Sequence, residues 1–190
     1  AICSRDTVRP GIGVTASGRG VMAFTVLGAD NFPSAGYSAL DVDDLTRRHR
    51  EVVEAWETGR LPFDEYLDVI VFHAPRPFTK AAFTDYMMAL SEPFAGSVEV
   101  VRELAAGGRG RLYTLNNESD QLNRHRIERF GLRGLFEAFC SSCWLGVRKP
   151  SHVIFQRAMA IAGAEASGIL FVDDRQQNLV PAAAAGWETH

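Results

Sequence analysis

The chain has 190 residues, 46% of them hydrophobic, and a formal net charge of −3 at pH 7. This length fits one domain, or one domain with a small insertion, and the apolar fraction allows a sizeable core. The small negative charge gives no reason to expect nucleic acid or an anionic membrane as a partner. No apolar run approaches the roughly 20 residues that a transmembrane helix needs. Charged residues interrupt the start of the chain, so it shows no signal-peptide pattern, and we expect a cytoplasmic protein.

The three cysteines are too few for a disulfide framework and fit a reducing compartment. Cys140 and Cys143 have the spacing of a redox motif, but they follow an apolar, strand-like run without a thioredoxin-like pattern around it. A redox role is therefore a minor alternative.

The first 36 residues are rich in glycine and only weakly patterned. Residues 12–15 and 21–27 are apolar enough to form strands. Neither stretch leads into an acidic or glycine-rich site, and the sequence Gly18-Arg19-Gly20 lacks the lysine and the glycine spacing of a phosphate loop.

From residue 41 the apolar residues follow a helical spacing. Gly59 ends the first predicted helix, Pro62 opens the second, and Thr79 is a suitable N-cap for the third, which ends near Pro93. No strand pattern interrupts this stretch. We therefore expect a helical module inserted in an otherwise alternating chain, with its aromatic residues used for packing rather than for a cofactor.

From residue 96 the predicted strands alternate with helices. The strands are expected over residues 111–115, 136–140 and 168–173, and helices of ordinary length separate them. Such alternation predicts a parallel sheet with right-handed crossovers.

Polar residues follow two of these strands. Asn116 and Asn117 come after the first, and Asp173 and Asp174 come after the last. Because ligands bind beyond the carboxyl ends of parallel strands, these side chains should meet at one edge of the sheet. Lys149 lies in a loop between elements that can reach the same edge.

This set of residues suits phosphoryl chemistry. Two adjacent carboxylates repel each other unless a cation lies between them, and their oxygens suit Mg²⁺. Amide and N–H groups can hold phosphate oxygens, and a lysine neutralises charge on the phosphoryl group. The alternative is that Asp173 only ends a strand and that Asp174 or Arg175 only begins a helix. The polar residues upstream favour the functional interpretation.

Three segments in this order carry a family resemblance: residues 112–118, 140–150 and 170–178. With them the chain resembles the haloacid dehalogenase-like hydrolases, in particular the phosphatases with a helical cap inserted after the first strand. The resemblance covers roughly residues 40–190. It implies an α/β fold in which residues 1–36 and 96–190 form a Rossmann-like parallel-sheet core and residues 37–95 form an inserted α-helical cap. The family would also add one more short strand where this sequence stops, at residues 186–190.

The resemblance assigns roles to several residues. Phosphate binding falls on Asn116 and Asn117, charge neutralisation on Lys149, and Mg²⁺ binding on Asp173 and Asp174. The family has a Ser or Thr at the first of these positions, and an amide can donate to a phosphate oxygen in its place. Thr114, two residues earlier on the same strand face, is the alternative match.

The first motif departs most from the family, which needs an aspartate nucleophile at the end of the first strand to form an aspartyl-phosphate. The best positional match is the sequence of residues 16–21, which puts Ser17 at the nucleophile position. Asp6 is the second candidate and Asp30 the third, and none fits the motif fully. An altered or frame-shifted first strand would give the same pattern.

The resemblance therefore implies a Mg²⁺-dependent phosphatase of a small phosphorylated molecule, as a monomer or homodimer, with an activity that the atypical first motif would impair. Two alternatives stay open: an inactive protein of this fold that binds phosphate or metal, and a dehalogenase. Dehalogenases need no metal and tend to break up the paired aspartates, so Asp173 and Asp174 favour the phosphatase. The sequence does not give the substrate, because the cap selects it.

Overall fold

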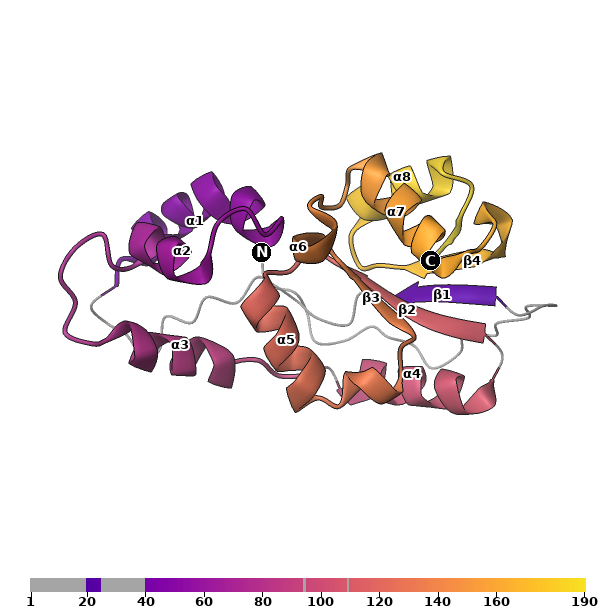
Figure 1. The fold of residues 1–190 in the computed structure, drawn as a ribbon, viewed down its shortest axis with the longest axis horizontal. Coiled ribbons are helices and arrows are strands. Elements are labelled where there is room, and N and C mark those ends of the chain that lie inside the picture. Colours follow the sequence, from indigo (N-terminus) through magenta and orange to yellow (C-terminus); the bar gives the residue numbers. More distant parts are fainter. Residues whose placement is uncertain (1–19, 25–39, 94, 109) are drawn as a thin grey trace.

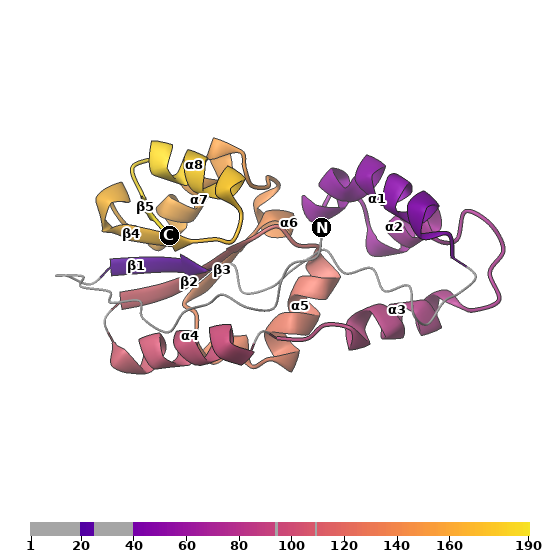
Figure 2. The same cartoon turned by 180° about the vertical axis from the view of Figure 1, so that it is seen from behind.

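The computed structural model describes residues 20–24, 40–93, 95–108 and 110–190. These residues form an α/β core with a group of helices at one end of it (Figures 1 and 2). The predicted fold class, a Rossmann-like parallel sheet with an α-helical cap, is confirmed. No helix in the described ranges has both the length and the apolar character that a membrane span requires.

The core is built on one parallel sheet. Its strands are β1 (Gly20–Phe24), β2 (Gly110–Asn116), β3 (Ala138–Ser141), β4 (Ile169–Val172) and β5 (Glu188–Thr189). They lie in the order β3-β2-β1-β4-β5, and every neighbouring pair is parallel. β1 is therefore the central strand, with Phe24 level with Thr114 of β2 and with Val172 of β4. β5 supplies the last short strand of the family, so the expectation that the chain stops before this strand is wrong.

Helices cover both faces of the sheet. α4 (Ala95–Gly107) and α5 (Asp120–Arg129) lie on one face, and α7 (His152–Ala162) and α8 (Gln176–Ala184) lie on the other (Figure 1). A four-residue helix, α6 (Ser142–Leu145), follows β3 directly.

The limits of α7 follow from its capping residues. The Ser151 side chain accepts a hydrogen bond from the backbone N–H of Val153, which satisfies a donor at the first turn. Gly163 ends the helix in the left-handed conformation, with φ 58°, which glycine adopts at little cost.

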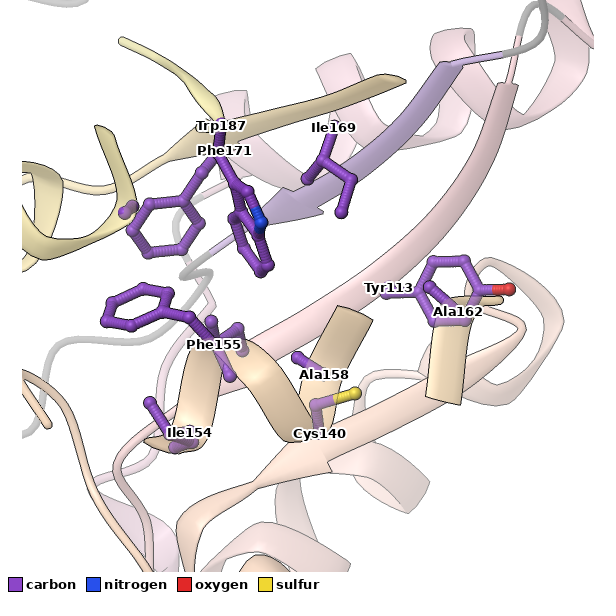
Figure 3. Close-up of a cluster of buried hydrophobic side chains, with 11 residues drawn as sticks. Tyr113, Cys140, Ile154, Phe155, Ala158, Ala162, Ile169, Phe171 and Trp187 are labelled. Carbon is purple, nitrogen blue, oxygen red and sulfur yellow. The ribbon is translucent and has the colours of Figure 1, made fainter. Parts of the chain in front are cut away.

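An aromatic cluster packs β4 against α7 and the last turn of the chain (Figure 3). Phe155, Phe171 and Trp187 meet edge to face, with ring centroids 5.4 to 5.9 Å apart. Each such pair contributes about 0.5–1.5 kcal/mol beyond the burial of its surface. Phe171 is fully buried and lies two residues before Asp173, so the strand that leads into the paired aspartates is anchored in this core.

The helices of the cap have their own core. They are α1 (Val42–Glu57), α2 (Phe63–Ile70) and α3 (Lys80–Ala89). The Thr79 side chain accepts a hydrogen bond from Ala82 N–H, which confirms it as the N-cap of α3. Trp56 stacks on the fully buried Tyr66, with centroids 3.6 Å apart. These aromatic side chains pack within the cap, and Leu122 of α5 joins the same cluster.

Candidate functional site

Three distant parts of the chain meet beyond the carboxyl ends of β2 and β4. The Nζ atom of Lys149, from the loop between α6 and α7, donates to Asp173 Oδ2 at 2.6 Å and to the Leu115 carbonyl at 2.8 Å. The Lys149 side chain is 2% exposed and that of Asp173 is 0% exposed. The sequence-predicted lysine and first aspartate thus form a buried ion pair that spans from β2 to β4.

The Asp173 carboxylate is held at both oxygens. Its Oδ1 accepts hydrogen bonds of 2.9 Å from the backbone N–H of Arg175 and from Asn178 Nδ2. Burial of the Lys149 amine lowers the pKa of that group, and the charge of Asp173 acts in the opposite direction. A charge pair of this kind requires good geometry, because desolvation of either ion alone costs several kcal/mol.

Asn116 belongs to a closed triangle of buried side chains. Its Oδ1 accepts from Ser141 Oγ at 2.9 Å, and its Nδ2 donates to Asn123 Oδ1 at 3.2 Å. Asn123 Nδ2 in turn donates to Ser141 Oγ at 2.8 Å. An amide nitrogen carries two N–H groups, so the contact with Asn123 uses only one of the two on Asn116. Thr114 is also buried, and its hydroxyl has no hydrogen-bond partner in the described part of the chain.

Asn117 contacts the backbone of Lys149 with both polar atoms of its side chain. Lys149 N–H donates to Asn117 Oδ1 at 2.7 Å, and Asn117 Nδ2 donates to the Lys149 carbonyl at 2.9 Å. The structure therefore brings this predicted phosphate-binding residue to the predicted lysine.

The two aspartates differ in how well they suit a metal ion. Both oxygens of Asp173 are engaged, whereas Asp174 is exposed beside it at the same edge. The described residues contain no group of three or more His, Cys, Asp or Glu side chains that could hold a metal. Mg²⁺ usually binds proteins through one or two carboxylates and keeps waters and phosphate oxygens as its other ligands. The donor set fits a magnesium ion held through Asp174.

The three predicted nucleophiles, Ser17, Asp6 and Asp30, lie outside the described residues. Ser17 and Asp6 precede β1 in the sequence, whereas Asp30 is the first carboxylate that follows Phe24. The identity of the nucleophile therefore stays a prediction.

The turn between α1 and α2 docks on the core beside the site. Ser142 Oγ donates to the Glu57 carbonyl at 2.6 Å, and Arg148, next to Lys149, pairs with the Glu57 carboxylate at 3.1 Å. A pocket of about 260 Å³ lies at this junction, between residues of that turn and the starts of α5 and α6. Trp56 and Trp144 are among its lining residues. Sequence reasoning missed this junction, because no local pattern indicates which loops meet across the fold.

Sequence reasoning also missed a second ion pair, between the buried Glu118 and the partly buried Arg126. Burial raises the pKa of the Glu118 carboxyl, and the Arg126 guanidinium acts in the opposite direction. Arg126 Nε also donates to Ser91 Oγ at 3.2 Å, in the segment that follows α3. The pair thus ties the segment after Asn117 to the connection between cap and core.

The two described cysteines are free thiols. Burial raises the pKa of Cys140 to about 11 and is also the main cause that raises the pKa of Cys143 to about 12. Redox-active cysteines need a lowered pKa, because the thiolate is the reactive form. The redox alternative therefore loses its support.

Comparison with known proteins gives matches over most of the chain. A family model described as haloacid dehalogenase-like hydrolase matches residues 25–186. Pyrimidine 5'-nucleotidase YjjG of Escherichia coli (strain K12) is 32% identical over 98 residues, which cover 51% of this chain and 43% of that protein. The match therefore spans less than half the length of this curated relative.

Solved structures share the fold. A HAD family enzyme from Bacteroides thetaiotaomicron has a TM-score of 0.76 at 16% identity, covering 91% of this chain and 92% of that chain. The same wild-type enzyme in complex with magnesium and inorganic phosphate has a TM-score of 0.66 at 14% identity, covering 90% and 91%. L-2-haloacid dehalogenase from Xanthobacter autotrophicus, with chloropropionic acid covalently bound, has a TM-score of 0.62 at 16% identity, covering 89% and 74%.

Proposed function

Because the chain belongs to the haloacid dehalogenase-like hydrolase family, we propose that it is a Mg²⁺-dependent phosphatase that acts on a small phosphorylated metabolite. The observation that carries this proposal is the buried pair of Lys149 and Asp173, 2.6 Å apart at the carboxyl edge of the sheet. Transfer of a phosphoryl group spreads negative charge over its oxygens, and a fixed ammonium group stabilises that charge without reorganisation.

Each residue of the site has a distinct part in this proposal. Lys149 binds and orients the phosphoryl group, and Asp173 keeps the lysine in place and favours its charged form. The remaining Nδ2 hydrogen of Asn116 donates to a phosphate oxygen. Asp174 holds Mg²⁺, which when bound neutralises charge on the phosphate.

The attack on phosphorus requires a carboxylate, which displaces the alcohol of the substrate and forms an aspartyl-phosphate. Water then cleaves this acyl-phosphate, which releases inorganic phosphate and restores the carboxylate. In this fold it belongs at the carboxyl end of the central strand, between Asn116 and Asp173. Asp30 is favoured by its place after β1 in the sequence, and Asp6 is the other carboxylate candidate. Ser17 is the positional match to the motif but offers a hydroxyl and not a carboxylate. Hydrolysis by Asp30→Asn, Asp6→Asn and Ser17→Ala variants identifies the nucleophile, since its loss should abolish turnover.

The related proteins support the phosphatase over its alternatives. One is a nucleotidase, and another was crystallised with magnesium and inorganic phosphate. A dehalogenase also shares the fold, but the exposed Asp174 beside Asp173 favours a metal-dependent reaction here. We place the cap at residues 37–95 and the core at residues 1–36 and 96–190, and we expect a monomer or homodimer.

Steady-state hydrolysis tests the proposal. We would assay p-nitrophenyl phosphate and a pyrimidine nucleoside monophosphate with Mg²⁺ or with EDTA, on the wild type, Lys149→Met and Asp174→Asn. Asp85→Asn, an exposed site on α3, makes the same chemical change away from the site. We expect turnover that needs Mg²⁺ and falls about 100-fold or more in both site variants but not in the control.

Two other outcomes would favour the alternatives. Phosphate binding without any turnover by the folded protein would indicate an inactive binding protein. Metal-independent release of chloride from 2-chloropropionate would indicate a dehalogenase.

A further inference from the structure

The side-chain amide of Asn117 pairs with Lys149 as a neighbouring strand would. In an antiparallel ladder, one residue exchanges both its N–H and its C=O bonds with the residue opposite. Asn117 makes this exchange with a side chain: it accepts from Lys149 N–H at 2.7 Å and donates to the Lys149 carbonyl at 2.9 Å. The donor and acceptor on Lys149 fix which end of the amide faces which, so the orientation of Asn117 follows from the contact itself.

The end of β2 therefore holds the lysine at two points. Asn117 fixes its backbone, and the carbonyl of the fully buried Leu115 accepts from its Nζ at 2.8 Å. Asp173 of the β4 edge holds the same Nζ at 2.6 Å. A lysine side chain is otherwise among the most mobile, so these contacts order the ammonium group before any ligand arrives.

These contacts engage both polar atoms of the Asn117 side chain with the backbone of Lys149. Its Oδ1 cannot bind a phosphate oxygen, because both are acceptors, and one of its two Nδ2 hydrogens donates to the Lys149 carbonyl. We propose that Asn117 is a positioning residue: it acts on phosphate binding through Lys149, whose backbone it holds, rather than as a phosphate ligand. The proposal rests on the proposed function only in that Lys149 is the cation that meets the phosphate.

Hydrogen exchange and phosphate binding together test this proposal on the whole protein. We would measure the exchange of the Lys149 amide by NMR, and the affinity for inorganic phosphate by calorimetry, in the wild type, Asn117→Ala and Asn117→Asp. Gln156→Ala, an exposed amide on α7, is the matched control. Neither readout requires turnover.

Asn117→Ala should raise the exchange rate of the Lys149 amide roughly tenfold and raise the Kd for inorganic phosphate roughly tenfold. Each change is about the effect of one or two neutral hydrogen bonds. Asn117→Asp keeps an acceptor for the Lys149 N–H, so it should keep the protection of that amide. The amides of β2 should stay protected in both variants. If Asn117→Ala does not fold, Asn117→Ser, which is too short to span both groups, replaces it.

Two results would overturn the proposal. One is weaker phosphate binding in Asn117→Ala with the Lys149 amide still protected, which would make Asn117 a direct ligand. The other is loss of that protection with unchanged phosphate affinity. If the wild type binds no phosphate, the proposed function fails, and the proposed role of Asn117 in phosphate binding fails with it. The exchange of the Lys149 amide then still shows whether the Asn117 contact exists.

Discussion

Replacement of Asp173 by asparagine should destabilise the whole fold as well as the site. The variant leaves the Lys149 ammonium buried, at 2% exposure, beside the Leu115 carbonyl but without the negative charge of Asp173. An asparagine has a single acceptor oxygen, so it cannot receive both the lysine on one side and the N–H groups of Arg175 and Asn178 on the other. Its own NH₂ group would face one of these donors.

The size of the effect follows from the burial of the pair. Removal of one partner from a buried ion pair costs about 3–5 kcal/mol. Since 1 kcal/mol shifts the Tm of a domain of this size by about 2–4 °C, the Tm of Asp173→Asn should fall by roughly 6–20 °C. The double variant Asp173→Asn/Lys149→Met also removes the buried ammonium group. Its free energy of unfolding should therefore fall by less than the sum of the losses in the two single variants.

Thermal and urea unfolding, followed by circular dichroism at pH 7, measure all four corners of this cycle. The exposed Asp85→Asn variant should stay within about 0.5 kcal/mol of the wild type. If the free energy of unfolding of Asp173→Asn falls by less than about 1 kcal/mol, the reasoning is refuted, because the lysine is then not held as a buried charge. Simple additivity in the double variant would refute the coupling between the two residues.

Two further predictions concern other parts of the fold. Gly59→Ala places a Cβ atom 2.5 Å from the Cys143 carbonyl oxygen, at a residue with φ 72°. We therefore expect the free energy of unfolding in urea to fall by about 1–3 kcal/mol. An unchanged urea midpoint would contradict the close approach. Burial raises the pKa of Cys140 to about 11 from 9.0. Its rate of alkylation at pH 8 should therefore be about 100-fold lower than that of an ordinary thiol. The rate should rise about tenfold per pH unit up to about pH 11. Peptide-resolved mass spectrometry measures the rate, and labelling as fast as in urea-unfolded protein would contradict the burial.

The parts of the fold that sequence reasoning predicted well have local physical causes. Capping side chains such as Thr79 and Ser151 act within three residues of their own position, so the residues themselves mark where a helix begins. The apolar run of β4 is likewise visible without knowledge of its neighbours. α6 and β5 were missed because four and two residues are too few to show a period.

The site was predictable in its members but not in its contacts. Lys149 and Asp173 follow from strand ends and from the family resemblance, and the structure brings them together. The partner of Asn117 lies 32 residues away, on a loop whose path depends on the packing of α6. Residue type alone indicated an amide near a phosphate, and only the tertiary structure shows that this amide faces the protein backbone.

The central position of β1 has a consequence for how the molecule can be divided. β2 and β4 are linked in the sheet only through β1, so without this strand each would present a row of unpaired N–H and C=O groups. In the sequence, the four helices α1 to α4 separate β1 from both of these partners. A cut between Phe24 and Leu40 would therefore leave a large piece with a sheet split in two and a short peptide that fits the gap. Such a pair is suited to fragment complementation, in which the peptide restores the sheet without a covalent link.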